Sequence, residues 1–240
     1  MEVKIFNTAE EIAAACAEIF AEQLIKKPDS VLGLATGASP VKTYNELIKK
    51  CKNGEISFSQ VKTFNLDEYC DLPRDDKNSY YTFMHENLFN YVDIKEENVH
   101  ILDGNAADAD KEAADFDAAI DEAGGIDIQL LGIGTNGHIG FNEPSDSFSD
   151  GTFKVKLTDS TIKSNSIYFE NDSMPRFALT MGINSIMKAK KIVLIATGEA
   201  KADAIKATVD GEVTPICPAS VLKNHSDAIL LIDKEAAKLL

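Results

Sequence analysis

Cysteine and histidine are scarce in this sequence, and neither is arranged for disulfide or metal chemistry. The four cysteines, Cys16, Cys51, Cys70 and Cys217, form no Cys-x-x-Cys pair, so neither a disulfide framework nor a zinc site is indicated. The four histidines, at positions 85, 100, 138 and 225, lack the short spacings of zinc ligands. We therefore expect a soluble protein of a reducing compartment, with no metal site.

Long apolar runs are missing as well. The sequence has no run of 18 apolar residues, so no membrane-spanning helix is expected. The alanine-rich stretch after the first six residues contains Glu10, Glu11 and Glu18, which the apolar region of a signal peptide would not carry. A cytoplasmic location is therefore our expectation.

Basic residues are outnumbered by acidic ones. The chain has 24 Lys and Arg against 39 Asp and Glu, a formal net charge of −15 at pH 7. Non-specific nucleic-acid binding depends on neutralisation of phosphates by Lys and Arg, so we expect neither a nucleic acid nor an anionic membrane as partner. A small anionic substrate is not excluded, because backbone amides and one or two cations can hold a phosphate inside an acidic protein.

Short apolar segments alternate with helical patterns along the 240 residues. We expect strands at 1–6, 31–35, 61–66, 126–131, 191–196 and 228–232, and helices at 41–50, 79–90, 108–122 and 199–208, with a short helix at the C-terminus. This alternation predicts an α/β fold with a largely parallel sheet and helices on both faces. Because 44% of the residues are hydrophobic and no linker interrupts the pattern, we expect residues 1–240 to form one domain.

The most informative segment is Leu-Gly-Ile-Gly-Thr-Asn-Gly-His-Ile-Gly-Phe-Asn-Glu-Pro at 131–144. It follows the strand expected at 126–131, and open α/β sheets bind ligands in loops at the carboxyl ends of their strands. Glycine at such density lets the backbone adopt positive φ and approach a ligand closely. His138 and Glu143 are five residues apart, so a curved loop could turn both toward one pocket. A glycine-rich turn with a structural histidine is the alternative.

A second turn, Ala-Thr-Gly-Ala-Ser-Pro at 35–40, has the features of an anion site. Ser39 is expected to cap the following helix, with Pro40 in its first turn. Free amides and the positive end of the helix dipole would then face outward. Gly-Lys-Ser/Thr and Gly-x-Gly-x-x-Gly are both absent here, so a simple phosphate ester is favoured over a nucleotide. An ordinary capped helix start is the alternative.

Two carboxylates and a lysine complete the candidates. Asp67 and Glu68 follow the strand expected at 61–66. Neighbours in an extended segment point to opposite sides, so one of the two should face the pocket and transfer protons while the other is structural. Lys201 lies in the first turn of the helix expected at 199–208, where the dipole disfavours a cation unless it meets an anion. The alternatives are an acid-rich helix start and a solvated surface lysine.

Together these segments closely resemble the glucosamine-6-phosphate deaminase family. The similarity rests on Phe-Asn-Leu-Asp-Glu-Tyr at 64–69, Ser-Tyr-Tyr at 79–81 and His-Ile-Gly-Phe-Asn-Glu-Pro at 138–144, with further matches at 36–37, 178–182 and 201. Related 6-phosphogluconolactonases share the glycine-rich turn and the histidine but typically differ after it. The resemblance implies a modified Rossmann-like three-layer α/β sandwich. It also implies conversion of glucosamine 6-phosphate to fructose 6-phosphate and ammonia, without a metal or organic cofactor.

The resemblance also implies a role for each candidate residue. His138 would open the sugar ring, because an imidazole can hold or release a proton near neutral pH. Glu143 and Asn136 would orient the imidazole, and Asp67 would move a proton between C2 and C1. The phosphate would be held by Lys201 together with the loop residues Thr36, Gly37, Ala38 and Ser39.

Four positions depart from the pattern of the enteric members of the family. Those members carry Asp where Asn136 stands and Arg where Ile167 stands, and they carry basic residues where Phe153 and Val155 stand. We therefore expect more of the phosphate binding to fall on Lys201, and no activation by N-acetylglucosamine 6-phosphate. The sequence leaves the oligomeric state open. A 6-phosphogluconolactonase-type hydrolase, which would need no C2 base, and a non-catalytic sugar-phosphate sensor are the alternative functions.

Overall fold

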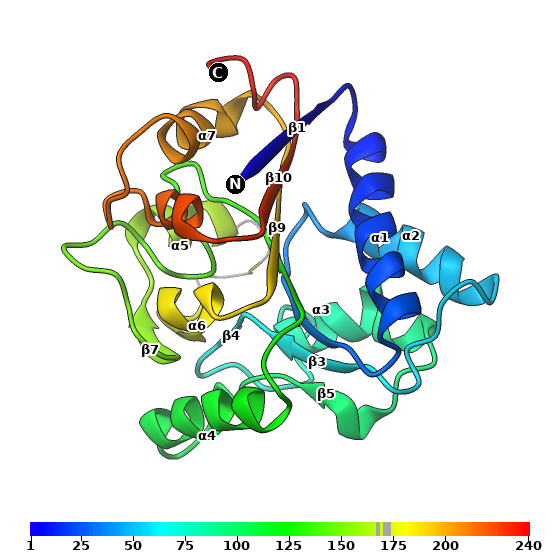
Figure 1. The fold of residues 1–240 in the computed structure, drawn as a ribbon. Coiled ribbons are helices and arrows are strands. Elements are labelled where there is room, and N and C mark those ends of the chain that lie inside the picture. The colour runs from blue at the N-terminus through cyan, green and yellow to red at the C-terminus, as the bar shows by residue number, and fades with distance from the viewer. Residues whose placement is uncertain (167–168, 170–173) are drawn as a thin grey trace.

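The computed structural model describes residues 1–166, 169 and 174–240 (Figure 1). Its strands are β1 (Glu2–Phe6), β2 (Val31–Leu34), β3 (Lys62–Asn65), β4 (Asp67–Tyr69), β5 (Val99–His100), β6 (Ile128–Leu131), β7 (Phe153–Lys156), β8 (Phe177–Thr180), β9 (Lys191–Ala196) and β10 (Ala228–Asp233). Its α-helices are α1 (Ala9–Lys26), α2 (Val41–Lys52), α3 (Tyr80–Asn87), α4 (Ala109–Glu122), α5 (Asp159–Asn165), α6 (Ile183–Met187) and α7 (Ala202–Val209). Short 3₁₀ helices are η1 (Phe89–Tyr91), η2 (Glu96–Asn98), η4 (Glu199–Lys201) and η5 (Pro218–Asn224).

The central sheet is parallel, as the alternating pattern predicts. Seven strands lie in the order β1-β10-β9-β6-β2-β3-β5, and every pairing between neighbours is parallel. Helices α1 and α2 cover one face and α6 and α7 lie on the other (Figure 1). Because both faces are covered, the inner strands β2 and β6 are buried along their whole length.

Local signals explain where the longest helices begin. Helix α1 starts after Thr8, whose hydroxyl accepts a hydrogen bond from the Glu11 amide at 3.2 Å, and α4 starts after Asp108, which accepts from the Lys111 amide at 3.0 Å. Each side chain satisfies an amide that has no partner inside its helix. No helix in the described ranges is long and apolar enough to span a membrane.

The structure corrects two predictions at helix ends. Ser39 does not cap α2, because the residue at the N-cap position is Pro40 and no side chain caps this helix. Ser39 therefore lies one residue too early to reach the first free amides. The helix expected at the C-terminus is absent, since residues 234–239 form turns. That segment is too short to repay the cost of starting a helix.

Two further helices are shorter than predicted. The helix expected at 79–90 ends at Asn87, because Leu88 leaves the helical backbone with a φ of −146°, and the chain continues as η1. The helix expected at 199–208 begins with the 3₁₀ turn η4 and becomes α-helical only at Ala202.

A second sheet was not predicted at all. Strands β4, β8 and β7 form a three-stranded sheet in which β4 and β7 both pair with β8 in antiparallel fashion. Its strands come from residues 67–69, 153–156 and 177–180, so the pairings join segments far apart in the sequence.

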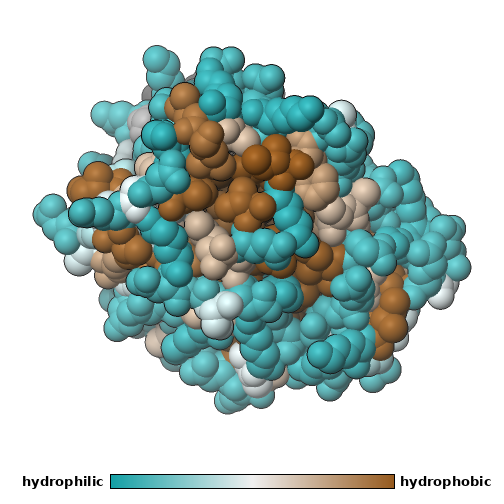
Figure 2. Space-filling view, turned by 45° about the horizontal axis from the view of Figure 1, so that its top comes forward, coloured by the Kyte–Doolittle hydropathy of each residue, from teal (hydrophilic) through white to brown (hydrophobic). Residues whose placement is uncertain are grey.

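The surface is hydrophilic over most of the view in Figure 2, with one large area of apolar side chains in its upper centre and smaller apolar groups near its left and right edges. Separately, strand β1 is an edge strand of the central sheet, and its Ile5 is 54% exposed. Leu239 and Leu240 are also exposed.

Candidate active site

A cavity of about 300 Å³ lies at the carboxyl edge of the central sheet. Residues that follow β2, β3, β6 and β9 line it, among them Ala35, Leu66, Gly132 and Lys201. From β2 the chain proceeds outward to β3 and β5 and then returns to place β6 on the other side of β2. Such a reversal of strand order opens a crevice, which is where open α/β sheets bind ligands.

Glycine allows His138 to pack onto its own loop. The Gly134 amide donates a hydrogen bond to the His138 carbonyl at 2.8 Å and closes the loop. A Cβ atom on Gly134 would lie 2.2 Å from Cε1 of His138, so any other residue would displace the imidazole. The glycine-rich loop thus fixes the place of the His138 ring in the cavity wall.

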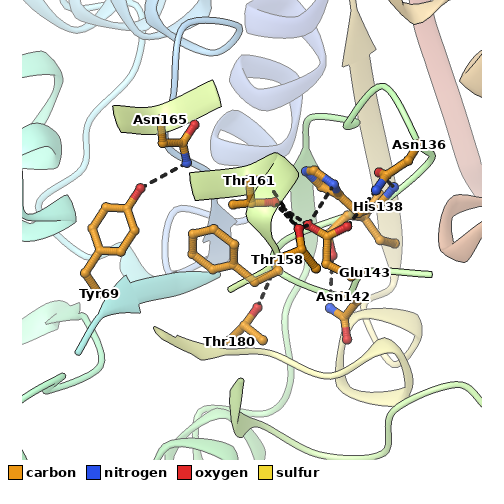
Figure 3. Close-up of polar contacts among 11 residues, drawn as sticks. Tyr69, Asn136, His138, Asn142, Glu143, Thr158, Thr161, Asn165 and Thr180 are labelled. Atoms are coloured by element: carbon orange, nitrogen blue, oxygen red, sulfur yellow. Dashed lines mark hydrogen bonds and ion pairs between the residues drawn. The ribbon is translucent and has the colours of Figure 1, made fainter. Parts of the chain in front are cut away.

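Behind His138 lies Glu143, the centre of a polar network (Figure 3). One carboxylate oxygen is 3.4 Å from Nδ1 of His138 and accepts hydrogen bonds from Thr161 and, at 3.2 Å, from Thr158. The other accepts from the side-chain amide of Asn136 at 2.6 Å. The Asn136 carbonyl oxygen accepts from the backbone N–H of His138 at 3.2 Å.

This network keeps Glu143 ionised. Burial raises the pKa of its carboxyl, but the close imidazole of His138 and the hydrogen bonds from Thr161 and Asn136 outweigh burial and lower the pKa to about 2. An ionised Glu143 beside Nδ1 favours the tautomer in which Nδ1 carries a proton and Nε2 is free to exchange one. Asn136 supports Glu143 and the backbone of His138 and is not among the residues that line the cavity.

Asp67 and Glu68 face opposite ways, as expected for neighbours in an extended segment. Asp67 lines the cavity and is 7% exposed. Glu68 points away from it and accepts hydrogen bonds from three backbone amides, those of residues 69, 80 and 81. Gly140 leaves room opposite Asp67, since a Cβ atom there would lie 3.7 Å from Oδ2 of Asp67 and 2.9 Å from the Thr180 hydroxyl. Its positive φ of 57° also favours glycine.

Burial gives Asp67 the properties of a general acid–base group. Burial and, second, the nearby charge of Glu68 raise the pKa of Asp67 to about 8. No hydrogen bond from a described residue reaches its carboxylate to oppose this shift. A carboxyl with a pKa near neutrality can both accept and return a proton during one reaction cycle.

The loop at 36–39 and Lys201 lie on the same cavity, as predicted. The amides of residues 36–39 make no hydrogen bond to any other described residue, so they are available to an anion. Lys201 stands at the N-cap of α7, and burial lowers the pKa of its ammonium group. Within the described ranges no carboxylate lies at ion-pair distance from Lys201.

Sequence reasoning missed the contribution of α5. This helix carries Thr161, which holds Glu143, and Asn165, whose amide donates to the Tyr69 hydroxyl at 3.0 Å (Figure 3). Thr161 and Asn165 also line the cavity, as does Tyr80. The threonine and asparagine lie in a polar segment with no apolar period, so no local signal marks them. Tyr80 belongs to a segment that matched the family, but no role was assigned to it.

The structure thus brings most of the candidates onto one cavity: Asp67, His138, Thr36, Gly37, Ala38, Ser39 and Lys201. Asn136 and Glu143 stand behind His138. Ile167 lies outside the described residues. No group of three or more His, Cys, Asp or Glu side chains in the described part of the chain could hold a metal ion.

The fold and the site define a Rossmann-like α/β protein with a polar cavity at the carboxyl edge of its sheet, lined by Asp67, His138 and Lys201. More particularly, the chain belongs to the glucosamine-6-phosphate isomerases/6-phosphogluconolactonase family, whose model matches residues 6–231. A curated glucosamine-6-phosphate deaminase from Thermoanaerobacter sp. (strain X514) is 52% identical over all of this chain and 95% of its own length. One from Clostridium botulinum (strain Kyoto / Type A2) is 49% identical over all of this chain and 99% of its own length.

Solved structures agree with this assignment. A structure described as a monomeric glucosamine-6-phosphate deaminase has a TM-score of 0.97 and 44% identity, with both chains fully covered. The 6-phosphogluconolactonase from Trypanosoma cruzi has a TM-score of 0.80 but only 19% identity, over all of this chain and 96% of that one. The latter likeness shows the fold alone.

Proposed function

We propose that this chain converts glucosamine 6-phosphate and water to fructose 6-phosphate and ammonia. The observation that carries the proposal is that Asp67 and His138 line one cavity together with the loop at 36–39 and Lys201. This reaction needs three elements: a base that moves a proton between C2 and C1, a group that carries a proton during ring opening, and a site for the phosphate. The full-length identity of 52% to a relative named for this activity supports it.

Ring opening is the proposed task of His138. The proton of the anomeric hydroxyl must leave and the ring oxygen must gain one, so that the C1–O5 bond breaks and an aldehyde forms at C1. An imidazole whose Nδ1 faces an ionised carboxylate can carry this proton on Nε2. Glu143, with its pKa lowered to about 2, keeps its charge while this transfer takes place.

Isomerisation is the proposed task of Asp67. Its carboxylate takes the proton from C2 of the open-chain sugar while the C1 oxygen gains a proton from water, which gives an enolamine between C1 and C2. Asp67 then returns its proton to C1 as the nitrogen on C2 gives one up to water. The carbon at C1 is thereby reduced to a hydroxymethyl group and C2 becomes an imine. Water adds to this imine, and ammonia leaves from C2 to give the ketone of fructose 6-phosphate.

The phosphate anchors the substrate for both steps. The amides of residues 36–39 and the ammonium of Lys201 supply donors on one side of the cavity. Binding the distal phosphate there holds C1 and C2 against Asp67, so binding energy from a non-reacting group assists the chemical steps.

A direct assay tests this function. Ammonia and fructose 6-phosphate should form in equal amounts from glucosamine 6-phosphate. Asp67→Asn should nearly abolish both while leaving sugar-phosphate binding within a few-fold of wild type, because it removes the base at similar shape. Asp71→Asn is the matched control, since Asp71 is an exposed carboxylate four residues further on.

Other outcomes of the assay would favour the two alternatives. Hydrolysis of 6-phosphogluconolactone without ammonia release from the amino sugar would favour a lactonase. Binding of the sugar phosphate without turnover would favour a sensor. If Asp67→Asn exchanged the C2 proton of bound substrate with solvent at the wild-type rate, the assignment of the base would be wrong.

A further inference from the structure

Glu68 is a buried carboxylate for which the reaction proposed above has no use. The residue is only 5% exposed to solvent. Oε1 accepts hydrogen bonds from the amides of Tyr69 at 2.8 Å and Tyr80 at 2.9 Å, and Oε2 accepts from the amide of Tyr81 at 2.8 Å. Within the described ranges no Lys, Arg or His lies at ion-pair distance from it. Glu68 is therefore held by backbone donors alone.

These three donors match an ionised carboxylate. An ionised carboxylate only accepts hydrogen bonds, whereas a protonated one would have to direct its O–H toward one of the amides. Two of the amides belong to the first turn of α3, where the helix dipole also favours a negative charge. Burial raises the pKa of Glu68 above its ordinary value, and the amides of Tyr80, Tyr81 and Tyr69, together with the charge of Arg74, limit that rise.

The turn that Glu68 holds forms a wall of the cavity. The ring of Tyr80 lines the cavity and lies parallel to that of Phe141, with centroids 6.2 Å apart. The Tyr80 hydroxyl donates to that of Tyr69 at 3.2 Å, which in turn accepts from Asn165 of α5. Figure 3 shows the Tyr69–Asn165 contact on the side opposite the Glu143 network.

We propose that Glu68 is a positioning residue: without touching substrate, it fixes the first turn of α3 and the Tyr80 ring against the cavity and keeps a buried negative charge beside Asp67. Asp67 and Glu68 are neighbours in β4. One peptide bond therefore joins the proposed acid–base residue, Asp67, to Glu68, which holds the start of α3. The kinetic consequence of this role rests on the function proposed above, whereas its effect on Asp67 itself does not.

Glu68 differs from the tyrosines around Asp67 because it carries a negative charge and they do not. Tyr44 on α2, Tyr69 on β4 and Tyr80 on α3 face the same region, and burial raises the pKa of each phenol, so all three are neutral at physiological pH. His138 and Lys201 line the cavity across from Asp67. Glu68 is thus the neighbouring negative charge that raises the pKa of Asp67, after burial itself.

A matched control separates this role from simple support of the helix. Ser79 caps the same helix, since its hydroxyl accepts from the Thr82 amide at 3.0 Å and donates to the Arg74 carbonyl at 2.7 Å. Ser79→Ala removes this cap, which loosens the start of α3, and it changes no charge. Glu68→Gln keeps the shape of the side chain but removes the charge. It also places the NH2 group of Gln, a donor, against a backbone N–H that donates to Glu68 in wild type.

The experiment follows the carboxyl carbon of Asp67 by NMR in protein labelled with ¹³C at aspartate, with the signal identified by its loss in Asp67→Asn. In wild type this carbon should titrate near pH 8, the value that burial and Glu68 together impose. In Glu68→Gln its midpoint should fall by on the order of one pH unit, and in Ser79→Ala it should stay in place. An unchanged midpoint in Glu68→Gln, or an equal fall in Ser79→Ala, overturns the proposal.

Two further measurements complete the test. If Glu68→Gln is too unstable to titrate, Glu68→Asp keeps the charge at shorter reach, and its Asp67 midpoint should remain near that of wild type; a fall of one unit there refutes the role of the charge. The acid limb of the kcat/KM profile for ammonia release should move with the NMR midpoint. Should wild type release no ammonia, the proposed function fails while the NMR result still decides the role of Glu68.

Discussion

Replacing Asp67 by Asn should stabilise the protein, and the gain should grow as the pH rises. Burial and Glu68 raise the pKa of Asp67 from an ordinary 3.8 to about 8 in the folded chain. Between these two values the folded state holds a proton that the unfolded state has lost. The unfolded state therefore binds fewer protons, and the free energy of unfolding falls with rising pH. Asn has no proton to lose, so the variant escapes this penalty.

The size of this stability difference follows from the single proton that the folded chain keeps on Asp67 and the unfolded chain loses. Each pH unit between about 4 and 8 should cost wild type about 1.4 kcal/mol relative to Asp67→Asn. For a chain of this length a change of 1 kcal/mol moves the melting temperature by roughly 2–4 °C. The Tm of the variant should therefore gain on that of wild type by about 3–5 °C per pH unit. Such a loss of stability would fit the proposed catalytic role, because catalytic positions often cost a protein stability.

Thermal unfolding at pH 5, 6, 7 and 8 measures this directly. Asp71→Asn, at an exposed position, should give a Tm difference from wild type that does not change with pH. A difference between Asp67→Asn and wild type that also stays constant from pH 5 to 8 would refute the reasoning, because it would mean that Asp67 is already ionised in the folded chain at pH 5. A difference that shrinks as the pH rises would likewise contradict a raised pKa of Asp67.

Three further predictions concern activity. His138→Gln should lose about 10²-fold or more in turnover of the cyclic sugar and much less in affinity for an open-chain amino alcohol; equal losses would contradict the ring-opening role. Lys201→Ala should lower kcat/KM about ten- to a hundredfold, or roughly 1.5–3 kcal/mol for one charge-assisted contact, and an unchanged kcat/KM would remove it from the phosphate site. Rates should be hyperbolic with and without N-acetylglucosamine 6-phosphate, because the cavity beside Phe153 and Val155 has no Lys or Arg among its described lining residues; sigmoidal rates that this ligand makes hyperbolic would contradict that.

The parallel sheet and the ligand loops could be predicted from the sequence because their signals are local. Strand Ile128–Leu131 is aliphatic at three of its four positions and buried at all four, as expected of a strand that is covered on both faces. The loop that follows contains glycines whose spacing has a direct steric reason, since a Cβ on Gly134 would strike His138. In these cases a few neighbouring residues contain the whole physical argument.

Predictions failed where the outcome depended on the exact start of an element or on distant partners. Ser39 has the right chemistry for a cap, but the N-cap position is taken by Pro40, one residue later than the sequence suggested. Thr161 holds Glu143 across 18 residues of chain, and Asn165 reaches Tyr69 across 96. Neither residue differs in its local pattern from an ordinary polar residue of a surface helix.

The sheet that the sequence did not predict is also the part that aligns the two acid–base candidates. Strand β4 is only three residues long, and its local sequence says that Asp67 and Glu68 point apart but not which of them faces the cavity. Pairing with β8 decides this, because Asp67 lies opposite Thr180 and Glu68 opposite Leu179. The Thr180 hydroxyl accepts a hydrogen bond from the Phe141 amide at 3.1 Å, within the loop that carries His138 (Figure 3). One residue of β8 therefore contacts both the strand of Asp67 and the loop of His138, through a long-range pairing that no local pattern contains.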